Sequence, residues 1–213
     1  MQISPAESQE EKERIFRFRY SIYVEEMGKP MPGANHERRT LRDDLDERST
    51  HLFAKRSDEL IGAIRITWGA DGLPERFVNW YGLERFNGFP KEEISFTGRL
   101  MVTESLRSSA VSLALAREAY RLGRERGVGF DFIHTTPNLI PFFERLGHRR
   151  YASEFLDPDL GPRTPMVLVL GDLGHLESCQ SPFGSLAKSL NHHRPEHAEW
   201  FKNEFPSLQS HDV

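Results

Sequence analysis

The sequence contains a single cysteine, Cys179, among 213 residues. One thiol excludes an internal disulfide framework and a cysteine-rich zinc site, and it suits a reducing compartment. The chain has no apolar run that approaches the roughly 20 residues needed to span a bilayer. Met1 leads into a polar segment without the apolar core of a signal peptide. We therefore expect a cytoplasmic protein without a membrane span.

The sequence also lacks a strong excess of either charge. Its 32 acidic and 28 basic residues give a net charge of -4, so no global field favours nucleic acid or an anionic membrane. Internal repeats and low-complexity segments are missing as well. The hydrophobic content of 38% is enough for one sizeable core. Because the apolar pattern weakens after about Leu170, we predict one domain over residues 8–172 and a C-terminal extension over 173–213.

The apolar pattern alternates between helical and strand-like periods. A capping box formed by Ser8 and Glu11 begins a helix, which Gly28 brings to an end. Two apolar runs, 51–56 and 60–68, predict an antiparallel hairpin. Further strands are expected over 96–102, 130–135 and 165–170, and further helices from near Ser108 to Gly127, over 139–146 and, amphipathic, after Pro195. This order predicts a mixed α/β layer structure.

The junction between the strand at 96–102 and the helix after it combines features of an anion site. The first N–H groups of a helix are unpaired, and the positive end of the helix dipole lies behind them. Arg107 adds a charge, and the small or hydroxylated residues that follow let a diphosphate approach the backbone. These residues are Ser108, Ser109, Ala110 and Ser112. In the alternative interpretation, Ser108 only caps the helix and Arg107 is solvated.

The same residues resemble a known superfamily. Val102 to Ser112 is similar to the pyrophosphate-binding motif of the GCN5-related N-acetyltransferases, and residues 138–151 resemble their last helix. Asn138 and Phe143 then fall on cofactor-binding positions, and Phe143 stands where many members have a tyrosine that protonates the leaving thiolate. The resemblance implies a single domain with a mixed, mostly antiparallel central sheet flanked by helices. It also implies that the acyl donor is acyl-CoA or an acyl group on the phosphopantetheine of an acyl carrier protein. It implies no metal cofactor.

Four blocks of the N-terminal half narrow the resemblance. The segments RYSIYVEEMG, DDLDERSTHLFA, LIGAIRI and FTGRLMV are similar, in order, to the branch of acyl-homoserine-lactone synthases and long-chain N-acyl amino acid synthases. The recurring charged positions of this branch fall on Arg19, Asp43, Asp46, Arg65 and Arg99. Phe96 stands where the lactone synthases usually carry a glutamate. This departure argues against lactone formation and leaves amide formation open.

The resemblance implies an N-acyltransferase that moves an acyl group from a phosphopantetheine thioester to the amine of an amino acid or a related metabolite. Two alternatives stay open, an acetyl-CoA-dependent acetyltransferase of a small molecule or peptide, and a non-catalytic sensor of acyl thioesters.

A helical stripe of Arg117, Arg121 and Arg124 is either a solvated face or a docking site for an acidic acyl carrier protein. A homodimer is a further expected assembly.

The chemistry suggests roles for the charged residues. An amine is mostly protonated at neutral pH, so a carboxylate or a water beside it must accept a proton. Asp43 and Asp46 are the predicted acidic pair of the catalytic site, with Glu37 and Glu25 as further candidates for contacts to the amine. Composition alone favours the alternative that this acidic loop is merely solvated.

The arginines within apolar strands have two interpretations. We predict that Arg99 is catalytic and that Arg19 and Arg65 bind substrate, because a guanidinium can hold an acceptor carboxylate in a bidentate fork. Alternatively, Arg65 and Arg99 form buried structural salt bridges with the two aspartates. The superfamily polarises the thioester carbonyl with a backbone N–H, which the resemblance assigns to the residues Leu100, Met101 and Val102.

Overall fold

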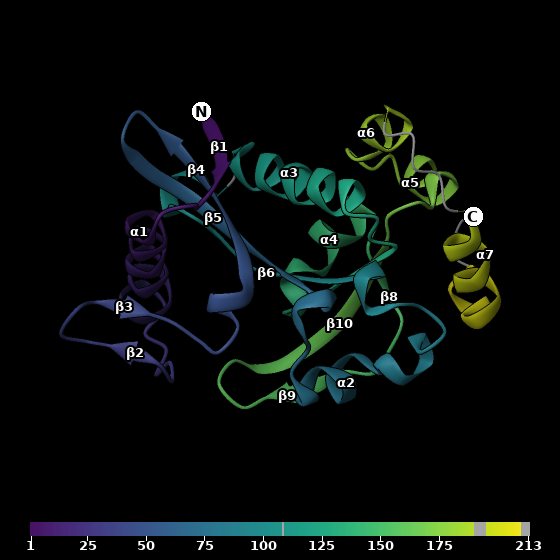
Figure 1. The fold of residues 1–213 in the computed structure, drawn as a ribbon, viewed down its shortest axis with the longest axis horizontal. Coiled ribbons are helices and arrows are strands. Elements are labelled where there is room, and N and C mark those ends of the chain that lie inside the picture. The colour runs from purple at the N-terminus through teal and green to yellow at the C-terminus, as the bar shows by residue number, and fades with distance from the viewer. Residues whose placement is uncertain (108, 190–194, 210–213) are drawn as a thin grey trace. The chain divides into compact units, whose positions relative to one another are not determined.

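The computed structural model describes residues 1–107, 109–189 and 195–209 of the chain (Figure 1). These residues form two compact units. The first comprises Met1–Thr67, Thr97–Ala119 and Pro158–Leu160, and the second comprises Trp68–Phe96, Tyr120–Asp157 and Gly161–Val213. Strand β6 (Ile94–Val102) and helix α3 (Val111–Glu125) each contribute residues to both units.

The strands of the first unit pair antiparallel. β1 (Gln2–Pro5) pairs with β4 (Ser49–Arg56), and β4 pairs with β5 (Glu59–Trp68). The predicted hairpin is therefore confirmed, and its register sets His51 opposite Arg65. A separate small hairpin joins β2 (Ala34–Asn35) to β3 (Thr40–Leu41).

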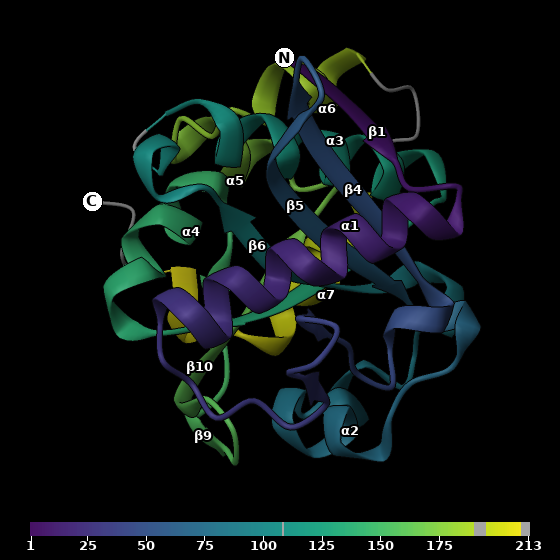
Figure 2. The ribbon, with the colours of Figure 1, turned by 90° about the vertical axis from the view of Figure 1, so that its left-hand side faces the viewer.

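Helix α1 (Gln9–Tyr20) begins with the predicted capping box between Ser8 and Glu11. It passes directly into a π-helical turn, η1 (Ser21–Glu26), and the chain then turns at Gly28 with a φ of 63°. Figure 2 shows α1 crossing in front of β4 and β5. Ile15 of α1 packs there in a core cluster with Phe53 and Ala63. An apolar face of α1 therefore packs against the sheet of its unit.

Helix α3 begins at Val111, later than the predicted start near Ser108. A 3-10 turn over Glu104–Leu106 follows β6, and the Ser109 hydroxyl accepts the Val111 N–H at 3.3 Å. A Cβ added at Gly62 of β5 would lie 3.0 Å from side-chain atoms of Val111 and Leu115. Since Gly62 and Ala63 point to opposite faces of β5, α1 and the first half of α3 cover opposite faces.

The second unit contains one parallel strand pair. The first residues of β6, Ile94–Phe96, run parallel to β7 (Phe130–Thr135). β7 pairs antiparallel with β10 (Gly161–Val169), which also pairs antiparallel with the short strands β8 (Arg149–Arg150) and β9 (Phe155–Asp157). The predicted strands at 96–102, 130–135 and 165–170 are confirmed within these bounds, and so is the mixed, mostly antiparallel α/β fold.

Five α-helices lie entirely within the described part of the second unit. They are α2 (Glu75–Tyr81), α4 (Ile140–Leu146), α5 (Leu173–Ser178), α6 (Gly184–Ser189) and α7 (Pro195–Glu204). The predicted helices at 139–146 and after Pro195 are confirmed. Trp200 of α7 packs against Phe86 with ring centres 5.0 Å apart, and Phe201 is fully buried. The C-terminal segment thus contributes to the core of this unit.

In the described residues, none of the helices is both long enough and apolar enough to cross a membrane.

Candidate active site

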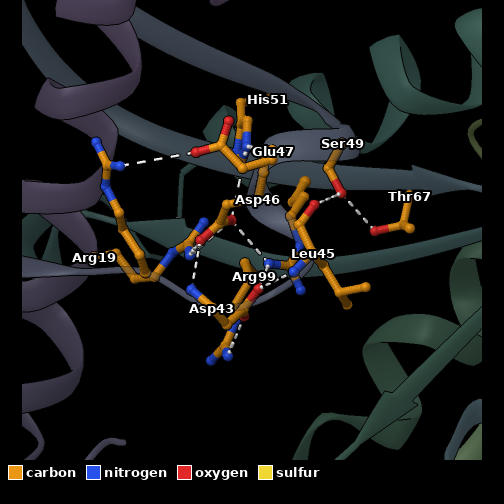
Figure 3. Close-up of polar contacts among 11 residues, drawn as sticks. Arg19, Asp43, Leu45, Asp46, Glu47, Ser49, His51, Thr67 and Arg99 are labelled. Atoms are coloured by element: carbon orange, nitrogen blue, oxygen red, sulfur yellow. Dashed lines mark hydrogen bonds and ion pairs between the residues drawn. The ribbon is translucent and has the colours of Figure 1, made fainter. Parts of the chain in front are cut away.

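A buried aspartate, Asp46, lies at the centre of a group of charges in the first unit (Figure 3). It begins the 3-10 turn Asp46–Arg48, directly before β4. Arg19, in the last turn of α1, places its Nη1 2.9 Å from Oδ1 and 2.7 Å from Oδ2 of Asp46. The two side chains are 1% and 3% exposed. A buried charge is very costly without its partner, so each of these residues requires the other.

Two further arginines extend this pair into a chain of alternating charges. Nη1 of Arg65, on β5, lies 2.9 Å from Oδ1 of Asp46 and 2.5 Å from Oδ1 of Asp43. Nη2 of Arg99, on β6, donates to Oδ2 of Asp43 at 2.8 Å. The Asp43 N–H donates to Oδ2 of Asp46 at 2.8 Å and fixes the loop between them. We call Arg19, Asp43, Asp46, Arg65 and Arg99 the charge cluster; its members are the five charged positions predicted from the sequence.

The arginines keep both aspartates ionised. Burial opposes the negative charge of Asp43, but Arg65, Arg99 and Arg19 outweigh it and hold the pKa of Asp43 well below its usual range. Burial likewise opposes ionisation of Asp46, and Arg19 and then Arg65 lower its pKa. A carboxylate with so low a pKa is a weak base at neutral pH. The cluster is therefore better suited to orienting charged groups than to removing protons.

A neutral histidine borders the cluster. Nε2 of His51 donates to the backbone oxygen of Asp46 at 3.0 Å, and burial lowers the pKa of this imidazole below its usual value. With His51 neutral, three guanidinium groups and two carboxylates leave the cluster one net positive charge. The site therefore attracts an anion.

The lowered pKa of His51 predicts a pH-dependent stability. Below the unfolded value of 6.5, the unfolded chain binds a proton that the folded protein does not bind, so stability falls as the pH decreases from 6.5 toward the folded pKa. His51→Gln removes this titration and should flatten the profile between about pH 7 and pH 5. Urea unfolding across this range measures the effect. Equal slopes in the wild type and His51→Gln would contradict the account.

Arg99 has an unusual backbone and an unsatisfied side chain. Its φ is 54°, in the left-handed region that a strand residue rarely adopts. Residues 97–100 are only partly buried, whereas both ends of β6 are buried. The Arg99 guanidinium carbon lies 5.2 Å from the Tyr23 ring centre. Its Nη1 is buried and has no hydrogen-bond partner among the described residues. Burial disfavours the charge, but Tyr23 and Asp43 outweigh it and raise the pKa of Arg99.

The predicted anion-binding residues of the first unit surround the start of α3. Nε of Arg107 donates to the Val102 oxygen at 3.3 Å, and its Nη2 forms an ion pair with Glu26. Ser109 and Ala110 are exposed, and Ser112 is partly buried in the first turn of α3. Leu100 is partly buried, whereas Met101 and Val102 are buried at the end of β6. Ser108, also predicted to bind an anion, lies outside the described residues.

Four other predicted residues are not members of the charge cluster. Glu37 is exposed in the turn between β2 and β3, and Glu25 accepts a hydrogen bond from Nε of Arg39 at 2.8 Å. Asn138 is exposed in a 3-10 turn of the second unit, and Phe143 is partly buried on α4.

The predicted arginine stripe on α3 requires a correction. Arg124 is buried, and its Nη1 donates to the Leu170 oxygen at 2.9 Å. Arg121 forms an ion pair with Glu125 on the same helix. Because Arg124 is buried, it cannot belong to an exposed docking surface. The helical spacing of the three arginines did not show that this part of α3 is covered.

Sequence reasoning missed three residues that contact the predicted site. Tyr23 follows Arg19 by four residues, so helical spacing was an available signal for it. His51 faces Arg65 across the predicted hairpin. Glu26 is 81 positions from Arg107, and no local pattern connects them.

The mixed, mostly antiparallel sheet is the fold that the sequence resemblance to N-acyltransferases implied. The family model described as N-acyl amino acid synthase FeeM matches residues 14–172. The chain belongs to this family. It is therefore an enzyme of N-acyl transfer, in which an amine takes the acyl group of a thioester. No curated protein matches the chain significantly.

Solved structures share the fold at low sequence identity. A TofI complex with an inhibitor and MTA has a TM-score of 0.67 at 16% identity, covering 87% of this chain and 100% of that one. The CoA-dependent acyl-homoserine lactone synthase BjaI, with SAM and isopentyl-CoA, gives 0.63 at 18%, covering 82% and 84%. FeeM, an N-acyl amino acid synthase from uncultured soil microbes, gives 0.64 at 17%, covering 87% and 97%.

Proposed function

We propose that the enzyme acylates the amino group of a free amino acid or a closely related metabolite, and that Arg99 binds the acceptor carboxylate. The buried, unpartnered Nη1 of Arg99 carries this proposal. An unsatisfied buried donor costs about 1–3 kcal/mol, which a carboxylate oxygen would recover. The net positive charge of the cluster favours the same ligand. Arg19 also has unpartnered nitrogens, but its side chain is only 1% exposed, compared with 16% for Arg99.

The two aspartates take different roles in this proposal. The Asp43 side chain is 21% exposed, so it can accept a hydrogen bond from the acceptor ammonium or from a water beside it. Asp46 is enclosed and acts by holding Arg19 and Arg65 in place. Because the pKa of Asp43 is low, Asp43 orients the amine, and water carries its proton away. The uncharged amine nitrogen then attacks the thioester carbon.

The backbone of β6 supplies the electrophilic group. We assign polarisation of the thioester carbonyl to an N–H of the segment Leu100, Met101 and Val102. The left-handed conformation at Arg99 supports this assignment, because such a residue interrupts the regular strand and redirects the N–H groups that follow it. As the carbon–sulfur bond breaks, the attacking nitrogen loses its second proton to water and becomes the amide, and the thiolate of the donor leaves and takes up a proton from water.

The donor is a phosphopantetheine thioester held at the start of α3. Arg107 offers a charge to phosphate groups, and Ala110 is exposed beside it. The Ser109 hydroxyl donates to the Leu106 oxygen at 2.6 Å and reaches a phosphate only when it gives up that bond. Ser112, in the first turn of α3, belongs to the same proposed donor-binding set. Asn138 and Phe143 of the second unit stay donor-binding positions that the sequence resemblance predicts. Both coenzyme A and an acyl carrier protein provide this chemistry, and acyl-CoA carries more phosphate charge for Arg107 to bind.

The proposal is tested with purified enzyme, acyl-CoA or acyl carrier protein thioesters of several chain lengths, and the standard amino acids. Mass spectrometry should detect an N-acyl amino acid, formed in step with released thiol. Release of thiol without an amide product would contradict the proposal.

Arg107→Glu tests the donor site in the same assay. Loss of a charge-assisted contact worth about 1.5–3 kcal/mol should raise the KM for acyl-CoA by about ten- to a hundredfold. The side chain is half-exposed, so the melting temperature should change little. An unchanged KM would remove Arg107 from the donor site.

A further inference from the structure

One turn of the chain contacts both arginines of the proposed site. The π-helical turn η1 carries Tyr23, which packs against the Arg99 guanidinium, and Glu26, which forms an ion pair with Arg107. Arg99 is proposed to bind the carboxylate of the acceptor, and Arg107 is proposed to bind the phosphates of the donor. The proposed function gives neither Tyr23 nor Glu26 a role.

Both contacts come from one short segment of widened helix. The Met27 N–H bonds to the Ile22 oxygen and the Lys29 N–H to the Tyr23 oxygen, each at 3.0 Å, so the turn is wider than in α1. Wide turns of this kind are short and occur often at functional sites. Within this widened turn, the Tyr23 ring reaches the Arg99 guanidinium and the Glu26 carboxylate reaches Arg107.

We infer that Glu26 and Tyr23 are positioning residues, with Glu26 holding Arg107 until the donor phosphates displace it and Tyr23 relaying that change to Arg99. The inference rests on the proposed function. The Glu26 and Arg107 side chains are 29% and 44% exposed, so their ion pair is screened and weak. A diphosphate carries more charge than one carboxylate and offers several acceptor oxygens, so it competes successfully for the guanidinium.

This arrangement couples the two substrates. Donor binding breaks the contact between η1 and Arg107, and the same turn carries the ring that packs on Arg99. By linkage, an acceptor bound at Arg99 changes donor affinity by the same factor by which the donor changes acceptor affinity.

Coenzyme A binding to the full chain, measured by calorimetry, tests the role of Glu26. Glu26→Gln removes the competing charge and should tighten coenzyme A binding by about two- to fivefold. Glu13→Gln is the matched control, because Glu13 forms a comparable ion pair with Arg42, with exposures of 28% and 36%. It changes the net charge equally and should leave the affinity at the wild-type value.

Hydrogen exchange measured by mass spectrometry tests the relay. In the wild type, coenzyme A should increase exchange in residues 21–29 and alter it around Arg99 in β6. In Glu26→Gln, residues 21–29 should already exchange faster without ligand. Tyr23→Leu should keep the wild-type affinity for coenzyme A but lose the response in β6.

Several outcomes would overturn the inference. They are equal or weaker coenzyme A binding by Glu26→Gln, an equal gain in Glu13→Gln, and a β6 response that survives in Tyr23→Leu. In each of these cases the proposed donor site would still stand, because the wild type binds coenzyme A. If none of the proteins bound coenzyme A, both this inference and the use of a coenzyme A donor would fail.

Discussion

Asp46→Asn should lower the free energy of unfolding by about 3–5 kcal/mol, the cost of breaking a buried ion pair from one side. The substitution keeps the size of the side chain but removes the charge that Arg19 and Arg65 share. Arg19 is then enclosed without a counter-ion. Chemical denaturation followed by circular dichroism measures the loss.

Two companion variants identify its cause. Glu47→Gln changes the adjacent carboxylate, which is 86% exposed, and should cost less than about 0.5 kcal/mol. Arg19→Met combined with Asp46→Asn removes the stranded charge and should recover part of the stability. A loss below about 1 kcal/mol for Asp46→Asn alone would show that the buried pair does not hold α1 to the turn before β4.

Local patterns predicted most of the fold because its elements have local causes. The capping box at Ser8 and Glu11 and the apolar runs of the hairpin are each contained in a short segment of sequence. Helix α2 was not predicted. It has only seven residues and no side-chain cap, and its buried residues Phe77 and Tyr81 pack against Phe96, which lies beyond it in the sequence. Short helices that depend on tertiary packing carry a weak periodic signal.

The candidate site was likewise predicted only in part. The resemblance identified the five charged positions, but it did not predict which aspartate pairs with which arginine. Asp46 contacts Arg19 and Arg65, whereas Asp43 contacts Arg65 and Arg99, and these pairs join residues 19 to 56 positions apart. The left-handed conformation of Arg99 also had no signal, because arginine carries no preference for it. Both features decide which arginine is accessible to an acceptor.

Arg99→Gln should lower kcat/KM by about ten- to a hundredfold, because it removes a charge-assisted contact to the acceptor worth about 1.5–3 kcal/mol. Its effect on stability should be smaller than that of Asp46→Asn. Asp43 keeps its contact with Arg65, and glutamine is no more strained than arginine at a φ of 54°. Arg99→Lys retains the charge but loses the planar fork, so we expect intermediate activity. Steady-state kinetics at saturating donor measure these effects.

The most direct test of carboxylate recognition compares a free amino acid with its carboxamide as the acceptor. The carboxamide keeps the reacting amine but lacks the negative charge that Arg99 is proposed to bind. We predict that wild-type kcat/KM is at least about tenfold higher for the free acid, and that Arg99→Gln brings the two values close together. Equal use of both acceptors by the wild type, or undiminished discrimination in Arg99→Gln, would contradict the account.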